Sequence, residues 1–445
     1  MGQTTRQKKQ ILALNAFAAD AEAPLPADVA DLVARRGRNF GATSVLFYER
    51  PLHIVGAKGA RIFTADGRSY LDLYNNVPSV GHCHPKVVEA VSRQMGRYNI
   101  HTRYLFDEVH DYAERLLAHF PAPLTNVAFT CTGSESNDLA LRLIRGATGG
   151  QGIVVTETAY HGNTLAVTEV SPSSYKRGTP PAYVRAVPPP HPRHYGADVG
   201  AGFAAAITAA AQAMAAEGIP FAGLLVDSIF SSDGVYADPP GFLAPAFAAA
   251  RAAGGMVIAD EVQPGFARTG THMWGFARHG VVPDVVTMGK PMGNGFPLGG
   301  VVTRPDLLQR FADAFGYFNT FGGNPVASAA GLAVLGAIAE DGLMENARVV
   351  GGRIVERLTA ARARCPAIGE VRGAGLYLGV EIVSAGTGAP DAEGASALIN
   401  ALREDGILIG AAGPLGHVLK VRPPLCLTLD EADRFADAME KILAA

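Results

Sequence analysis

Several short apolar stretches of this 445-residue chain are each followed directly by residues capable of chemistry. Lys290 is the sharpest case, because it follows Val285–Met288 within the segment GKPMGNG, where glycines and a proline surround it. An amine held there is partly shielded from water, which lowers its pKa and makes it a better nucleophile. A lysine that extends to solvent from a strand end is the alternative. A P-loop is rejected, because its upstream glycine and following Ser or Thr are missing.

Asp260 follows a second apolar stretch, Met256–Ala259, in the segment ADEVQ. A carboxylate beside a ring nitrogen favours the protonated form of that nitrogen, because the opposite charges attract. A protonated pyridinium is the electron sink that pyridoxal phosphate (PLP) chemistry needs, so Asp260 is a candidate partner for that ring. Gln263 would donate a hydrogen bond to the phenolic oxygen of the same ring. A solvated Asp-Glu turn is the alternative interpretation.

Two further stretches end in residues suited to a phosphate group and to an aromatic ring. After Val127–Thr130, Gly133 and Ser134 open an amphipathic helix and offer free N–H groups, a hydroxyl and the positive end of a helix dipole. A serine N-cap with no ligand explains the same residues. After Gly152–Val155, Tyr160 would lie flat on a planar ring, with ordinary packing as the alternative.

The strands that must position these residues are continuously apolar rather than alternating, as expected for strands buried on both faces. Helical segments lie between most of them, which predicts an α/β fold with a mostly parallel central sheet sandwiched by helices. Ligands of such sheets bind beyond the carboxyl ends of the strands, so the residues above would meet at one edge. We therefore predict a PLP site there, with Lys290 joined to the cofactor as a Schiff base. The clearest strands are Val127–Thr130, Gly152–Val155, Gly223–Val226, Met256–Ala259 and Val285–Met288.

The two ends of the chain show a different pattern. A polar arm and a helical stretch over Thr4–Arg50 precede strand-like segments between Ile54 and Leu73, which predict a small antiparallel unit. After Gly322, two long helical stretches lead to alternating segments and to a final helix over Leu429–Leu443. Together the two ends predict a small α+β domain.

The length favours more than one domain. We predict an N-terminal arm with part of the small domain over 1–75, a large PLP-binding domain over 76–320, and the C-terminal part of the small domain over 321–445. The stretch Val184–Gly202, rich in Pro, His and Gly, is expected to be a surface loop.

The composition of the chain argues against nucleic-acid and membrane partners. The chain has 38 Lys and Arg against 41 Asp and Glu, for a net charge of −3, whereas nucleic acids and anionic lipid surfaces call for a basic excess. We expect no membrane span, because no apolar run reaches about 18 residues, and no secretory signal, because Met1–Gln10 is polar. The four scattered cysteines fit a reducing cytoplasm. His82, Cys83 and His84 lie in a turn with no further cysteine nearby, so we expect no metal.

As a set, the motifs of this chain resemble those of the class III aminotransferases, which are PLP enzymes of fold type I. The resemblance runs from about Phe47 to the C-terminus. It implies the fold type I transferase architecture and a homodimer with two active sites at the interface, with a tetramer as the alternative. The motifs are GHCHP at 81–85, TGSESN at 132–137, AYHG at 159–162, ADEVQPGFARTG at 259–270, TMGKPMGNGFPLGG at 287–300 and NTFGGNP at 319–325.

The resemblance also implies roles for single residues. Thr320 would reach the cofactor phosphate of the neighbouring subunit, whereas Gly133 and Ser134 would bind phosphate in their own. Tyr160 would cover one face of the ring and Val262 the other. The cofactor candidates are Gly133, Ser134, Tyr160, His161, Asp260, Val262, Gln263, Lys290 and Thr320.

Within the family, YNNVPSVGHCHP, NDLALRLIR and LKVRPPLC resemble the branch that holds mitochondrial alanine–glyoxylate aminotransferase and the ethanolamine-phosphate and phosphohydroxylysine phospho-lyases. Two positions depart from the family pattern. The arginine that commonly binds a substrate carboxylate is Lys420 here, with Arg422 directly before Pro423, and the glutamate that can pair with that arginine is Asp227. Lysine lacks the planar fork of arginine, so carboxylate recognition changes. The substrate candidates are Phe47, Tyr48, Asp227, Lys420 and Arg422.

We predict a cytoplasmic aminotransferase that moves an amino group from an amine or amino acid to pyruvate, glyoxylate or 2-oxoglutarate by a ping-pong mechanism, with Lys290 shuttling the proton. The main alternative is a phospho-lyase acting on an amino-alcohol phosphate such as ethanolamine phosphate, in which Lys420 and Arg422 would meet the phosphate dianion. Racemisation and non-catalytic PLP binding are further alternatives. Asp260 and Lys290 argue against the last, because a scaffold needs neither.

Overall fold

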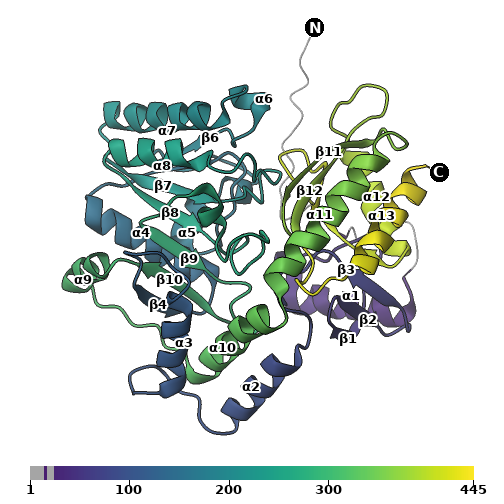
Figure 1. Cartoon of the computed structure of the whole chain (residues 1–445), viewed down its shortest axis with the longest axis horizontal. Coiled ribbons are helices and arrows are strands. Elements are labelled where there is room, and N and C mark those ends of the chain that lie inside the picture. The colour runs from purple at the N-terminus through teal and green to yellow at the C-terminus, as the bar shows by residue number, and fades with distance from the viewer. Residues whose placement is uncertain (1–14, 18–24, 445) are drawn as a thin grey trace.

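A computed structural model describes residues 15–17 and 25–444 of the chain. Figure 1 shows two lobes, a larger one around a broad sheet and a smaller one that holds both described ends of the chain. The mostly parallel α/β architecture is as predicted. The domain boundaries after residues 75 and 320 stay a prediction.

The larger lobe is built on a seven-stranded sheet with the order β4-β10-β9-β8-β7-β5-β6. Only β10 runs against its neighbours, pairing antiparallel with both β4 and β9, so the other six strands share one direction. The five predicted strands are all present, and their carboxyl ends therefore lie at one edge of the sheet. The strands are β4 Asn126–Thr130, β5 Gly152–Thr156, β6 Val184–Val187, β7 Phe221–Asp227, β8 Met256–Asp260, β9 Val285–Met288 and β10 Gly299–Thr303.

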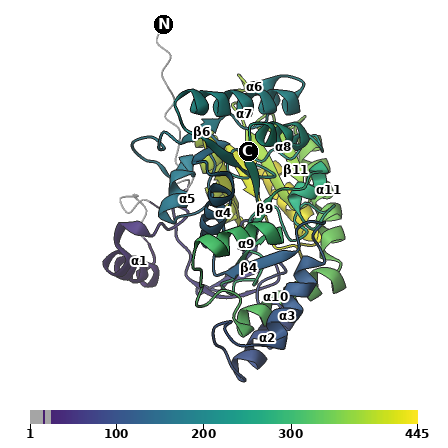
Figure 2. The same ribbon diagram turned by 90° about the vertical axis from the view of Figure 1, so that its left-hand side faces the viewer.

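Helices cover both faces of this sheet, because its strands are apolar on both. In β5, Ile153 and Val155 join a buried cluster with α4, α5 and α9, whereas Val154 between them joins a second cluster with α7 and α8. Alternate residues of a strand point to opposite faces, so the two groups of helices lie on opposite sides (Figures 1 and 2). The helices are α4 Gly133–Thr148, α5 Leu165–Glu169, α7 Val199–Ala216, α8 Leu243–Ala252 and α9 Pro305–Ala314.

The prediction of a surface loop over Val184–Gly202 is wrong at both ends. Its first four residues form the edge strand β6, paired with β5, and α7 already begins at Val199, with a one-turn helix α6 (Pro192–Tyr195) between them. The sequence does not reveal this short strand, because the prolines directly after it are typical of a loop. Contrary to expectation, α7 is long and apolar enough to cross a membrane by length and composition. Its Phe203 and Ile207 are fully buried against the sheet, although only 33% of the helix is buried in the protein.

The smaller lobe contains two four-stranded sheets. One has the order β1-β2-β3-β13, in which β1 to β3 are antiparallel as predicted and β13, from late in the chain, pairs in parallel with β3. The other has the order β11-β12-β15-β14. The two ends of the chain thus share one sheet. The strands are β1 Ile54–Lys58, β2 Arg61–Thr64, β3 Ser69–Asp72, β11 Ile368–Ala374, β12 Tyr377–Ile382, β13 Ile407–Leu408, β14 Gly410–Ala412 and β15 Val418–Val421.

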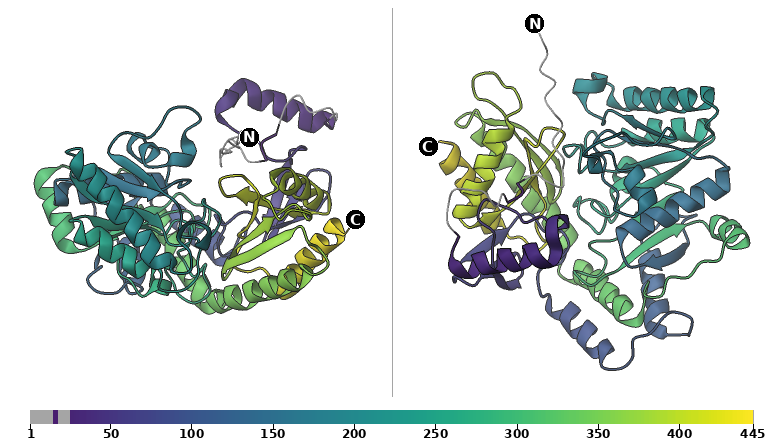
Figure 3. Two further views of the ribbon diagram at one scale, coloured as in Figure 1. Left: turned by 90° about the horizontal axis from the view of Figure 1, so that it is seen from above. Right: turned by 180° about the vertical axis from the view of Figure 1, so that it is seen from behind.

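The helices α10 and α11 lead from the larger lobe to the smaller one, and α1 lies beside the small sheets (Figures 1 and 3). The final helix was predicted correctly; Thr428 and Glu431 form a capping box at its start. The remaining helices are α1 Ala27–Phe40, α2 Pro85–Met95, α3 Asp107–Leu117, α10 Pro325–Glu340, α11 Leu343–Ala361, α12 Ala392–Glu404 and α13 Leu429–Leu443.

One glycine of α11 lets this helix pack directly on the turn between β11 and β12. A Cβ atom added at Gly351 would lie 1.9 Å from the carbonyl oxygen of Gly375 in that turn, which no side chain tolerates. At the next position, Gly352, an added Cβ would meet no heavy atom within 4 Å. The two neighbouring glycines therefore differ only in what lies beside them.

We expect Gly351→Ala to destabilise the protein by about 1–3 kcal/mol, because the helix must move away from the turn. The matched variant Gly352→Ala should instead stabilise it by about 0.5–1 kcal/mol, because alanine in a helix loses less backbone entropy on folding than glycine. Urea unfolding followed by circular dichroism measures both. Equal midpoints for the two variants would contradict the tight packing of α11 on the turn.

Candidate active site

The carboxyl ends of the parallel strands surround a cavity of about 200 Å³. Eight of the nine cofactor candidates line it, although they come from four separate parts of the chain. Thr320 is the exception. The lining residues are Thr132, Gly133, Ser134, Tyr160, His161, Gly162, Asp227, Asp260, Val262, Gln263 and Lys290.

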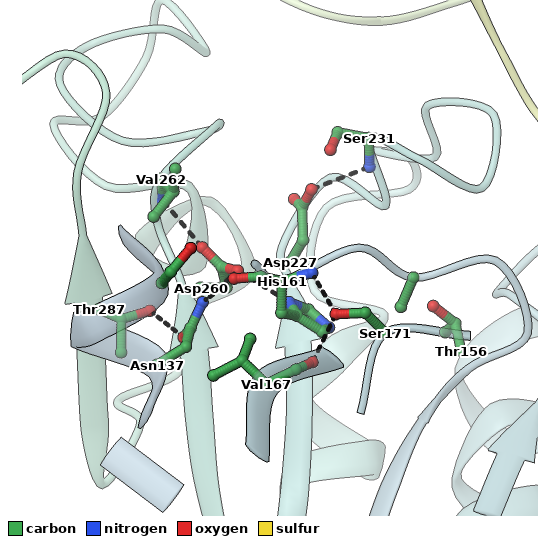
Figure 4. A network of polar contacts seen from close by, with 12 residues as sticks. Asn137, Thr156, His161, Val167, Ser171, Asp227, Ser231, Asp260, Val262 and Thr287 are labelled. Carbon is green, nitrogen blue, oxygen red and sulfur yellow. Dashed lines mark hydrogen bonds and ion pairs between the residues drawn. The ribbon is translucent and has the colours of Figure 1, made fainter. Parts of the chain in front are cut away.

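Asp260, at the end of β8, is buried and held by three donors (Figure 4). Its Oδ2 atom accepts hydrogen bonds from His161 Nδ1 at 2.7 Å and from Asn137 Nδ2 at 3.0 Å. Its Oδ1 atom accepts one from the backbone N–H of Val262 at 3.1 Å. Thr287 donates in turn to Asn137 Oδ1 at 2.7 Å, which fixes the amide. The carboxylate therefore has a set orientation at the cavity wall.

The N-terminus of α4 presents unused N–H groups to the cavity. Thr132 and Glu135 form a capping box, in which the Thr132 side chain accepts from the Glu135 N–H. The helix cap is therefore Thr132 and not Ser134. No described residue accepts a hydrogen bond from the N–H groups of Gly133 and Ser134, which suits them to an anion at the positive end of the helix. A Cβ at Gly133 would lie 2.7 Å from a methyl group of Val262, so only glycine fits there.

Lys290 lies just after β9, and no described residue accepts a hydrogen bond from its amine. Removal from water lowers the pKa of Lys290 to about 8, and the nearby Arg422 guanidinium acts in the same direction. Asp260 and Asp227 partly oppose this shift. A substantial fraction of the amine is thus neutral, and nucleophilic, near neutral pH.

A second cavity of about 190 Å³ adjoins the first and shares Tyr160, Gln263 and Lys290 with it. It lies between the two lobes and contains four of the five substrate candidates. The sequence predicts no role for Asn15, Tyr74 and Ser232, which also line this cavity. The lining residues are Asn15, Phe47, Tyr48, Tyr74, Tyr160, Ser232, Gln263, Lys290, Ile409, Gly410, Ala411, Lys420 and Arg422.

Two cations, Lys420 and Arg422, border this second cavity from β15 and the residue after it. Both are almost fully buried, and no described acidic residue lies within 4 Å of either charge. The Lys420 amine lies 5.9 Å from the centre of the Tyr377 ring, and the Arg422 guanidinium lies 4.4 Å from that of Tyr74. Burial, and next the charge of Arg422, lower the pKa of Lys420 well below its usual value.

Asp227 departs from its predicted place. It lines the first cavity and not the second, and it forms no ion pair with Lys420. Its two carboxylate oxygens accept hydrogen bonds from the backbone N–H groups of Ile229 and Ser231, each at 3.0 Å. The short aspartate side chain therefore binds within its own loop, although its charge still favours the protonated form of Lys420. Its role in substrate binding stays a prediction.

Residues 47–443 match the sequence model of a family described as Aminotransferase class-III. An "Alanine--glyoxylate aminotransferase 2-like" protein of Drosophila melanogaster is 39% identical, covering 93% of this chain and 87% of its own length. An "Ethanolamine-phosphate phospho-lyase homolog 1" of Caenorhabditis elegans is 34% identical, covering 93% of both chains. A crystallised phospholyase from Arthrobacter, in complex with phosphoethanolamine, matches with a TM-score of 0.89 and 42% identity, over 93% of this chain and all of that one.

The chain belongs to the class III aminotransferases. It is therefore a PLP-dependent enzyme of fold type I, as predicted. The residues present fit the cofactor on their own chemistry. Free N–H groups at a helix N-terminus suit its phosphate, an oriented carboxylate suits its ring nitrogen, and an amine of lowered pKa suits its aldehyde.

Two residues of this class III enzyme hold the site together although the sequence predicts no role for them, and a third, Thr320, lies away from it. Asn137 and Thr287 lie inside the quoted motifs, but no role was predicted for them; the available signal was that Asn137 is one helical turn from Gly133 and so on the same face. Thr320 is exposed and lies outside both cavities of its own chain. Its predicted contact with a neighbouring subunit stays a prediction.

The lowered pKa of Lys290 predicts how fast the cofactor-free enzyme reacts with PLP. When the imine is trapped with borohydride, the labelling rate should rise about tenfold per pH unit up to about pH 8 and level off above it, because only the neutral amine attacks. Peptide mapping by mass spectrometry locates the label, which Lys290→Ala should lack. A rate that still climbs between pH 9 and 10, as for an ordinary lysine, would contradict a shielded amine.

Proposed function

We propose that this enzyme acts on a small primary amine that carries a phosphate group, and that it eliminates the phosphate without a keto acid. One observation carries the proposal: Lys420 and Arg422 border the cavity beside Lys290, and no acidic residue in the described part of the chain contacts either charge. The Arthrobacter phospholyase, crystallised with phosphoethanolamine, supports it.

The charges around the second cavity favour a dianion over a carboxylate. A transaminase binds a carboxylate in one half-reaction and often a neutral or cationic side chain in the other, so its cation benefits from an acidic partner to neutralise it between the two. Asp227, the candidate for that task, is occupied by its own loop. Two cations that no described acidic side chain contacts directly instead suit a substrate that always brings two negative charges.

In this proposal the residues of the first cavity hold PLP and those of the second hold the substrate. The N–H groups of Gly133 and Ser134 bind the cofactor phosphate, Tyr160 and Val262 cover the ring, and Asp260 keeps the ring nitrogen protonated. PLP, when bound, supplies the sink for the electrons that remain when a carbon–hydrogen bond of the substrate breaks.

Lys290 is the general base, because its amine borders both cavities and accepts the proton from the carbon that bears the substrate amine. Lys420 and Arg422 hold the substrate phosphate and stabilise it as it leaves from the adjacent carbon. With ethanolamine phosphate, one water is consumed overall, and acetaldehyde, ammonia and inorganic phosphate are released.

Transamination is the second candidate, favoured by the family itself and by the 39% identity to an alanine–glyoxylate aminotransferase 2-like protein. It would use the same Lys290 and Asp260, with an amine or amino acid as donor and pyruvate, glyoxylate or 2-oxoglutarate as acceptor. The cations at Lys420 and Arg422 would then bind the carboxylate of the keto acid.

Phosphate release decides between the two. We expect the holoenzyme to release inorganic phosphate from ethanolamine phosphate with no keto acid present, at a rate that added pyruvate, glyoxylate or 2-oxoglutarate leaves unchanged. Lys420→Met should raise KM by about 30-fold, because a buried charge contact with the phosphate is lost. Phosphate assays and KM measurements test this. Turnover that requires a keto acid and yields an amino acid would establish transamination instead.

Lys420 also predicts the pH dependence of KM. The substrate phosphate is a dianion above about pH 6, so KM should fall as the pH rises through that value. At higher pH, KM should rise again as Lys420 loses its proton, because only the protonated amine attracts the dianion and burial lowers the pKa of Lys420. In Lys420→Arg the rise at high pH should disappear, because arginine stays charged. The same rise in both enzymes would exclude Lys420 as its source.

We further propose that the enzyme is a homodimer, supported by an apolar surface around Thr320. Leu105 is 88% exposed and Phe321 is 68% exposed. The two segments that carry them are adjacent, since the Arg103 guanidinium lies 3.9 Å from the centre of the Phe318 ring. Exposed apolar surface of this kind marks a protein interface. The patch consists of Ile100, Tyr104, Leu105, Phe315, Tyr317, Phe318 and Phe321.

Two charges placed in this patch should separate the subunits. We expect Leu105→Asp combined with Phe321→Asp to yield a monomer in analytical ultracentrifugation and to weaken PLP binding, because Thr320 could no longer reach a partner's cofactor. The matched control is Val349→Asp, which places the same charge on an exposed apolar residue of α11. A dimer that survives both changes would place the interface elsewhere.

A further inference from the structure

A buried asparagine joins the two cavities. Asn76 is 2% exposed and lies behind the cavity walls. Its Oδ1 atom accepts a hydrogen bond from Arg422 Nη1 at 3.0 Å, and its Nδ2 atom donates to Gln263 Oε1 at 2.6 Å. Arg422 Nη1 also donates to Gln263 Oε1, at 3.2 Å. One side chain therefore contacts both the cation of the substrate cavity and the amide of the cofactor cavity.

The donors and acceptors of this triad allow one arrangement only. A guanidinium donates and never accepts, so both Asn76 and Gln263 must turn their oxygens towards Arg422. Asn76 is then left with its NH₂ group for Gln263 Oε1. As a result, the NH₂ group of Gln263 is free to donate into the cofactor cavity, as the sequence predicted for the phenolic oxygen of the ring.

The loop that carries Asn76 is itself held at several points. The fully buried Asp72 accepts hydrogen bonds from the backbone N–H groups of Tyr74 and Asn75, at 3.0 and 2.9 Å, and its other oxygen contacts His82 Nε2 at 2.7 Å. The backbone N–H of Arg422 donates to the carbonyl oxygen of Leu73 at 2.8 Å. Asn76 and Arg422 thus keep a constant separation.

We propose that Asn76 is a specificity-determining residue: it positions Arg422 with a neutral oxygen and so leaves the full guanidinium charge available to a dianionic substrate. This inference rests on the proposed function, because it concerns the same phosphate. An aspartate at this position would make the same contact to Arg422, but as an ion pair that cancels one of the two cations. Aspartate would also place an unpaired oxygen against Gln263 Oε1 and turn that amide away from the ring.

The test compares anion binding by holoenzymes that differ at this site. Isothermal titration calorimetry with inorganic phosphate and, separately, with acetate gives the ratio of dianion to monoanion affinity. We expect Asn76→Asp to weaken phosphate binding by about 10-fold or more and acetate binding clearly less, so the ratio falls. Because both anions are measured on one preparation, a loss of folded protein does not change the ratio.

Two further variants distinguish the effect of an added charge at position 76 from the effect of a displaced Arg422. Asn76→Ala removes both hydrogen bonds without adding charge, so both affinities should fall by a similar, smaller factor and the ratio should hold. Asn126→Asp is the matched control. This asparagine is exposed at the start of β4, at the opposite end of the strand from the cavities, and accepts a hydrogen bond that an aspartate retains. Its ratio should equal that of the wild type.

The outcomes identify which idea fails. If the wild-type holoenzyme binds no phosphate, the proposed function and this inference both fall. If the wild type binds phosphate but Asn76→Asp keeps its affinity and ratio, only the role of Asn76 is overturned. If the ratio falls equally in Asn76→Ala, the proposed role of Asn76 is also overturned. The effect would then come from the displacement of Arg422 and not from the added charge.

Discussion

A carboxylate buried at the end of a strand is stable only when hydrogen-bond donors surround it, and Asp260 imposes that requirement on the whole cofactor cavity. Its donors come from α4, from the segment after β5 and from its own loop. To satisfy one side chain, three parts of the chain must therefore approach each other closely. The same approach brings the N-terminus of α4 and the end of β9 to the cavity, with Gly289, the residue before Lys290, packed close to Gly133.

The smaller lobe contributes two cations, Lys420 and Arg422, to the site. Two acids, Asp227 and Asp260, and three cations, Lys290, Lys420 and Arg422, influence one another across the two cavities. The acids are satisfied by N–H groups or neutral side chains close by, so the cations are left for ligands. The second cavity lies between the lobes, so the larger lobe contributes Tyr160, Gln263 and Lys290 to its wall, and the smaller lobe contributes Lys420 and Arg422.

The sequence was sufficient to predict the parallel strands and the residues that follow them, because buried strands are continuously apolar and their carboxyl ends must share an edge. It failed where local composition does not reflect tertiary pairing. The four residues of β6 look like a loop beside prolines, and β10 gave no separate signal from the glycines before it. Asn76 could not be assigned, because its partners Gln263 and Arg422 lie 187 and 346 residues away. The hydrogen bonds of Asp227 within its own loop could not be predicted from the family pattern, because that pattern does not show what a side chain shorter by one methylene contacts.

The lysine at position 420 shows how the fold tolerates two buried cations side by side. Two guanidinium groups would repel each other permanently, since arginine keeps its proton in proteins at a pKa above about 12. Burial lowers the pKa of Lys420, whereas a second arginine would keep its charge whatever the cavity holds. The replacement of the family's arginine by Lys420 is then no weakening of the site. With lysine at position 420 the site avoids two permanent charges side by side, and Arg422 is held by the neutral oxygen of Asn76.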